Sequence, residues 1–177
     1  MRKILSFAVA SLVVGLFAAI GAPSAHAQSS YELVEGKAFD SGFVKDFYLE
    51  GNAIPTQKRN AAMLKTADGK RLVFGLLDTT GYSADIQTKY IGMVIVEKKA
   101  MVGSVELPVG AYGFGLQKPA SGDGPAKILL YDVAGQKLGE TTAAHDAGVA
   151  QPAPLKVLVA KGQPTKLLLG KFGVEIK

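Results

Sequence analysis

Few residues of this chain have side chains suited to acid–base or nucleophilic chemistry. The sequence has no cysteine and only two histidines, His26 and His145. His145 stands directly before Asp146, and neighbours in sequence cannot readily form the bond between a catalytic base and its orienting group. Neither a G-x-S-x-G nor an H-E-x-x-H motif occurs. We therefore predict a solvent-exposed loop histidine, single out no catalytic residue, and expect no metal site or cofactor.

Carboxylates near turns offer another route to catalysis. A glycosidase needs two carboxyl groups roughly 5 to 9.5 Å apart around a sugar-sized cleft. Aspartates at strand ends more often bond the backbone of a turn. A hydrolase using two loop carboxylates is thus an alternative function. The candidates are Asp40, Asp46, Asp78, Asp85, Asp123 and Asp132.

The stretch ELPVGAYGFGL, residues 106–116, leaves one face of a strand bare, because bulky side chains alternate with Gly113 and Gly115. Glycine inside a strand marks a bend or the close approach of another group. Either an aromatic side chain from a facing layer packs on the glycines, or the glycines form the floor of a ligand groove. A phosphate-binding loop is not expected, because no helix follows.

Tyrosines are the available flat rings, because tryptophan is absent. Tyr82, in a Gly-Tyr-Ser loop, is the best candidate for an exposed ring, whereas Tyr112 belongs to a strand and directs its apolar side inward. The candidate ligand-binding residues are Tyr82, Tyr112, Gly113, Gly115 and Asp123. We expect them to bind a small apolar or amphipathic molecule, or an envelope protein.

The elements that position these residues are predicted to be strands. Turn signals recur at short intervals between segments rich in Val, Leu, Ile, Phe and Tyr. Turns are expected at 68–69, 107–110, 132–135 and 162–164, and Ser83 can cap one helical turn. About eight to ten strands result, in an antiparallel β-sandwich or a squat barrel. The predicted core is Leu72, Phe74, Leu76, Ile91, Met93, Ile95, Tyr112, Phe114, Leu129, Tyr131, Val157, Val159, Leu167 and Leu169.

One hairpin carries a resemblance. The segment VGSVELPVGAY resembles the V-x-G-x-x-L-P-x-G-x-Y hairpin of several families of small exported bacterial β-sandwich domains whose functions are unknown. The matching positions are Val102, Leu107, Pro108, Gly110 and Tyr112, while Ser104 stands where those families have glycine. The resemblance implies a β fold and export, and it transfers no site residues.

The N-terminus predicts export. Arg2 and Lys3 precede an apolar run, residues 4–20, and Ala25-His26-Ala27 provides the small residues of a cleavage site. This is the pattern of a cleaved signal peptide, residues 1–27. Cleavage leaves a single all-β domain, residues 28–177. We expect this domain in the periplasm or secreted from a bacterium, with no transmembrane segment. The net charge of +5 comes from dispersed lysines, so no nucleic-acid partner is expected.

The favoured function is therefore non-catalytic binding by an exported domain. Besides the hydrolase, a structural or assembly protein of the cell envelope is an alternative. It would use an exposed edge strand, and the C-terminal KFGVEIK, with lysines at both ends, is the expected edge.

Overall fold

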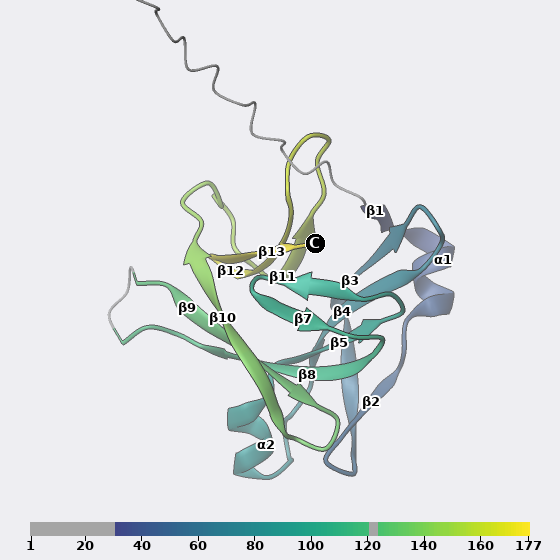
Figure 1. Cartoon of the computed structure of the whole chain (residues 1–177). Helices are drawn as coiled ribbons and strands as arrows, with labels where there is room; N and C mark the ends of the chain where they lie inside the picture. The colour runs from purple at the N-terminus through teal and green to yellow at the C-terminus, as the bar shows by residue number, and fades with distance from the viewer. Residues whose placement is uncertain (1–30, 121–123) are drawn as a thin grey trace, which may run out of the picture.

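The computed structural model describes residues 31–120 and 124–177. The predicted signal peptide and Asp123 lie outside the described residues. Thirteen antiparallel strands form one nearly closed, barrel-like sheet (Figure 1), which confirms the all-β prediction. In chain order the elements are β1 (Tyr31–Val34), α1 (Gly36–Gly42), β2 (Asp46–Leu49), β3 (Asn52–Thr66), β4 (Arg71–Leu77), α2 (Ala84–Lys89), β5 (Gly92–Val96), β6 (Ala100–Val102), β7 (Val105–Leu107), β8 (Gly110–Gln117), β9 (Ala126–Asp132), β10 (Lys137–His145), β11 (Ala153–Leu158), β12 (Thr165–Gly170) and β13 (Phe172–Ile176).

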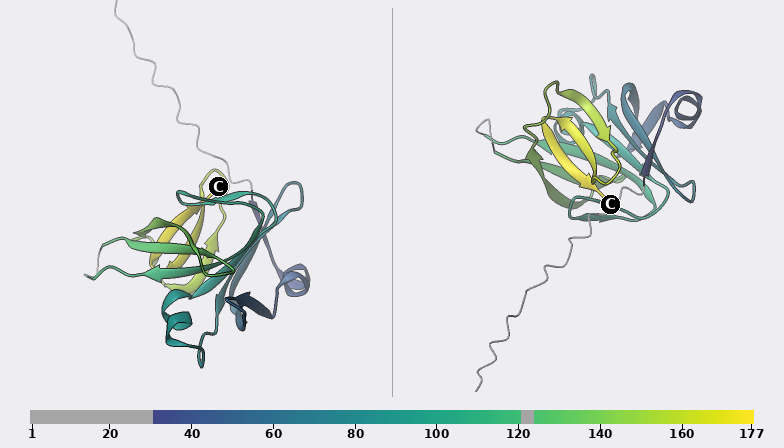
Figure 2. Two further views of the ribbon diagram at one scale, coloured as in Figure 1. Left: turned by 60° about the horizontal axis from the view of Figure 1, so that its bottom comes forward. Right: turned by 90° about the horizontal axis from the view of Figure 1, so that it is seen from above.

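The sheet curves until its two ends meet. Neighbouring strands follow the order β1-β3-β4-β5-β8-β9-β10-β13-β12-β11. β11 then lies against β3, and the right-hand view of Figure 2 shows the yellow C-terminal strands facing the blue N-terminal ones. Register shifts interrupt the ladders of β3, β10 and β11. Such bulges bend and twist a sheet, which lets it curl toward closure.

The turn predictions at 68–69 and 132–135 are confirmed. β3 and β4 are joined at Asp68-Gly69, and Gly69 takes a positive φ of 79°. Between β9 and β10, Asp132 accepts a hydrogen bond from the backbone N–H of Gln136 at 2.8 Å, and Gly135 has a φ of 89°. The strand number exceeds the eight to ten expected. β1, β2, β6 and β7 are three or four residues long, too short for a clear alternation pattern.

β13 is an inner strand, so the prediction that KFGVEIK forms an exposed edge is wrong. It pairs with β12 on one side, and with β10 and then β6 on the other. β10 and β13 pair only at Ala144 and His145. Farther along β13 the β6–β7 hairpin lies between the two strands: β6 pairs with β13, and the backbone N–H of Ser104 donates to Thr141 Oγ1 of β10 at 3.1 Å. Lys171 and Lys177 remain exposed beyond the ends of the strand, and therefore do not signal an edge.

Two apolar cores hold the molecule together. The larger core fills the barrel. The smaller lies outside it, where β2, α1 and α2 cover the outer face of β4, β5 and β8. Figure 1 shows both short helices outside the curved sheet, and neither is long and apolar enough to cross a membrane. Among the predicted core residues, Leu72, Phe74, Met93, Tyr112, Phe114, Val157, Leu167 and Leu169 are buried, whereas Leu76, Ile91, Ile95, Leu129, Tyr131 and Val159 are only partly buried.

Candidate functional site

The bare face of β8 is covered by the outer core. Gly113 lies between Met93 of β5 and Tyr131 of β9, directly opposite each in the ladders. The ring of Tyr90 lies over it, so that a Cβ at Gly113 would be 2.7 Å from two ring carbons. A Cβ at Gly115 would collide with the backbone carbonyl of Lys89. The glycines thus make room for a second layer. At Gly113, as one of the two explanations from the sequence states, an aromatic side chain packs on the glycine.

The other described candidates, Tyr82 and Tyr112, are not brought together. Tyr112 points to the barrel interior, opposite to Gly113, and its hydroxyl donates to the carbonyl of Pro108 at 2.9 Å. Tyr82 is half-buried against the outer core, with its hydroxyl bonded to the carbonyl of Ala53. The expectation of an exposed ring at Tyr82 is therefore wrong. The exposed ring belongs to Tyr48, at 66%.

Several candidate carboxylates already have partners. Asp78 accepts a hydrogen bond from the backbone N–H of Thr80 at 3.2 Å, and Asp132 bonds its own turn, as expected of aspartates at strand ends. Asp40 pairs with Lys58 at 2.6 Å. Within the described residues, no three His, Cys, Asp or Glu side chains are grouped closely enough to hold a metal ion.

Glu50 forms a polar cluster on the outer face. Its Oε1 accepts hydrogen bonds from Lys89 Nζ and from the Tyr90 hydroxyl, each at 2.6 Å. The bond from Lys89, followed by that from Tyr90, lowers the pKa of Glu50. Burial, followed by the bond to Glu50, raises the pKa of Tyr90. Since Glu50 stays charged and Tyr90 stays protonated, the cluster suits a structural clamp rather than proton transfer.

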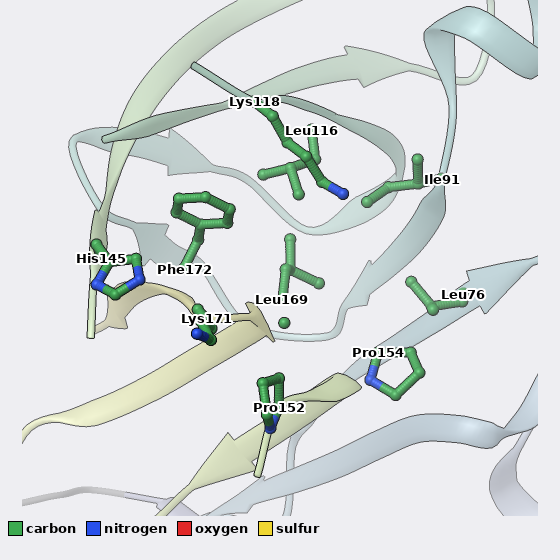
Figure 3. A pocket seen from close by; sticks show the side chains of 11 residues that line it. Leu76, Ile91, Leu116, Lys118, His145, Pro152, Pro154, Leu169, Lys171 and Phe172 are labelled. Atoms are coloured by element: carbon green, nitrogen blue, oxygen red, sulfur yellow. The ribbon is translucent and has the colours of Figure 1, made fainter. Parts of the chain in front are cut away.

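A cavity of about 570 Å³ opens at one end of the barrel. Because the strands are antiparallel, the ends of β4, β8, β10 and β12 meet the beginnings of β5, β11 and β13 there. We call this the mouth cavity, and Figure 3 shows its side chains converging from these segments. It is lined by Leu76, Ile91, Leu116, Lys118, His145, Pro152, Pro154, Leu169, Gly170, Lys171 and Phe172.

The mouth cavity has an apolar floor. Leu76, Ile91, Leu116 and Phe172 are only partly buried, and Leu169 is buried beneath them. Below this level the barrel is filled, for example by Phe114, which is 1% exposed and lies on the same face of β8 as Leu116. The cavity is therefore a shallow site at the rim of a packed barrel. It does not continue as a channel through the described part of the barrel.

A second cavity, of about 550 Å³, lies beside Gly115 on the outer face. Its lining combines the polar residues Asp85, Thr88, Lys89 and Gln117 with Leu116, Leu129 and Tyr131. Lys89 is already held by Glu50 and lies 5.0 Å from the centre of the Tyr131 ring. The mouth cavity offers more unpartnered apolar surface, and so is the better candidate for an apolar or amphipathic ligand.

His145 ends β10, within the strand rather than in the loop that the sequence suggests. It is exposed at the mouth, with its ring edge against Phe172 and 6.0 Å between ring centres. The sequence alone assigns Leu76, Ile91 and Leu169 to the core, and it attaches no ligand-binding role to Lys118 or Lys171. One signal in the sequence was the position of Lys118 directly after an apolar strand. Its proximity to Lys171 depends on the order of the strands in the sheet, which the sequence does not show.

Comparison of the chain with family models, curated proteins and solved structures finds no match.

Proposed function

We propose that this protein is a non-catalytic binding protein that holds a small amphipathic molecule in the mouth cavity. We further propose, from the N-terminal sequence, that it works in the periplasm or outside a bacterial cell. The observation that carries the binding proposal is the group of partly buried apolar side chains around one concave site. Ligand sites in proteins are typically concave, mostly apolar and about 300–1,000 Å³ in volume, and barrel mouths are common places for them.

The gain from binding is the removal of apolar surface from water. Leu76, Ile91, Leu116 and Phe172 still expose part of their side chains in the free protein. Each Å² of apolar surface that a ligand covers contributes roughly 25 cal/mol. Because the barrel is filled below the mouth, we expect a short apolar tail rather than a long chain.

The test is to fill the cavity. Leu76→Trp places a larger side chain in the floor of the mouth cavity alone, and we expect it to weaken binding of the neutral fluorescent probe N-phenyl-1-naphthylamine at least tenfold. Leu138→Trp is the matched control, because Leu138 is 44% exposed and lies outside the mouth cavity. Binding is measured by probe fluorescence, and folding of each variant by circular dichroism. Equal probe binding by both variants, or none by the wild type, would refute the proposal.

A further inference from the structure

The charge of the mouth cavity distinguishes it from three other cavities. Its lining includes Lys118 and Lys171 and, among the described residues, no carboxylate. The cavity beside α1 includes Glu35, that beside Gly115 includes Asp85, and that beside β10 includes Asp146 and Glu175. Among the described lining residues, positive charge is therefore concentrated at the mouth without a carboxylate to compensate it.

The two lysines reach the rim from separate segments. Lys118 follows the last residue of β8. Lys171 stands in the two-residue turn between β12 and β13, which Gly170 makes possible with a φ of 63°. Figure 3 shows the Lys118 side chain extending across the cavity toward Ile91, with Lys171 on the side of Leu169. The ammonium groups thus border the same apolar floor.

Both ammonium groups are available to a ligand as far as the described chain is concerned. Ten ion pairs form among the described residues, and none of them uses Lys118 or Lys171. A ligand anion beside a lysine gains charge-assisted hydrogen bonds. Lysine acts here as a flexible point charge, so it accepts differently shaped acidic groups.

Building on the proposed function, we infer that the ligand of the mouth cavity carries an acidic headgroup on a short apolar tail. The tail covers the floor formed by Leu76, Ile91 and Leu116, and the headgroup lies between Lys118 and Lys171. Carboxylates and phosphate monoesters share this chemistry. Because both lysines are exposed, each contributes modestly and the contribution weakens at high salt.

The test compares octanoate with 1-octanol, which share a tail length and differ in charge. Dissociation constants are measured by displacement of N-phenyl-1-naphthylamine from the wild type and from the Lys118→Gln/Lys171→Gln double variant. We expect the double variant to weaken octanoate binding about threefold or more and to leave octanol binding unchanged. Octyl phosphate, run in parallel, distinguishes the two acidic headgroups.

Lys161→Gln is the matched control, because Lys161 is exposed and lies in the β11–β12 turn, at the other end of β11 from Pro154. It should leave both affinities unchanged. If octanol binds and the double variant does not weaken octanoate or octyl phosphate, the headgroup inference is overturned while the proposed function stands. If the probe, octanol and both anions all fail to bind the wild type, the proposed function fails together with the inference.

Discussion

At the residue scale, glycine in β8 is a requirement of close packing. Because Gly115 has no side chain, the backbone carbonyl of Lys89 can approach it closely. The ring of Tyr90 approaches Gly113 for the same reason. A flexible neighbour can move away from an added methyl group, but a backbone carbonyl moves only with its chain. Gly115 is consequently the less tolerant position of the two.

We predict that Gly115→Ala lowers the free energy of unfolding by about 1–3 kcal/mol, because the new Cβ collides with the Lys89 carbonyl. Urea unfolding measures the change. Gly148→Ala is the control: Gly148 is exposed in a loop, its Cβ would lie 3.3 Å from Asp146 Oδ1, and the effect should be within about 0.5 kcal/mol. Equal effects of the two substitutions would show that the close approach at Gly115 is absent.

At the element scale, Glu50 connects the β2–β3 hairpin to the last residue of α2 and to the residue that follows it. Its carboxylate reaches Lys89 and Tyr90 from the tip of the hairpin, and its backbone N–H donates to the carbonyl of Val133 at 2.8 Å. The hairpin in turn contributes Leu49, which is fully buried in the outer core. Glu50 thus adds polar contacts to the apolar packing that holds the outer layer against the barrel.

We predict that Glu50→Gln destabilises the protein at pH 7 and that the difference from the wild type shrinks in acid. The folded pKa of Glu50 is lowered from its ordinary 4.5, so the unfolded chain takes up a proton first. The stabilisation is therefore present above pH 4.5 and is lost as the pH falls through the folded pKa.

Urea unfolding of both proteins between pH 7 and pH 3 measures the effect of Glu50→Gln. Glu106→Gln is the control, because Glu106 forms only an exposed pair with Lys99 at 3.2 Å, and such pairs contribute little. A difference between wild type and Glu50→Gln that stays constant down to pH 3 would contradict the clamp.

At the scale of the whole molecule, the sequence predicts local features and misses those set by strand order. The turns at Asp68-Gly69 and Asp132–Gly135 follow from residues adjacent in the chain. Leu76 and Phe172 both line the mouth cavity, and the closure of the sheet brings them close together. The inner position of β13 likewise depends on the β6–β7 hairpin, which pairs with it from a distant part of the chain.

The same distinction applies to the candidate site. Alternation in β8 correctly places Tyr112 and Gly113 on opposite faces, but cannot tell which face is covered by Tyr90. Only the order β4-β5-β8-β9 aligns Met93, Gly113 and Tyr131 in one row. Of the described candidate ligand residues Tyr82, Tyr112, Gly113 and Gly115, none lines the mouth cavity. The glycine signal marked the packed outer face of β8 instead.

A nuclear magnetic resonance titration of the ¹⁵N-labelled protein with N-phenyl-1-naphthylamine tests most directly whether the ligand site lies at the barrel mouth. Binding in the mouth cavity predicts that the largest amide shifts occur at Leu76, Ile91, Lys118, His145 and Phe172. Amides of the outer face, such as those of Thr88 and Leu129, should change little. The largest shifts on that outer face, or no shifts at saturating probe, would contradict a ligand site at the barrel mouth.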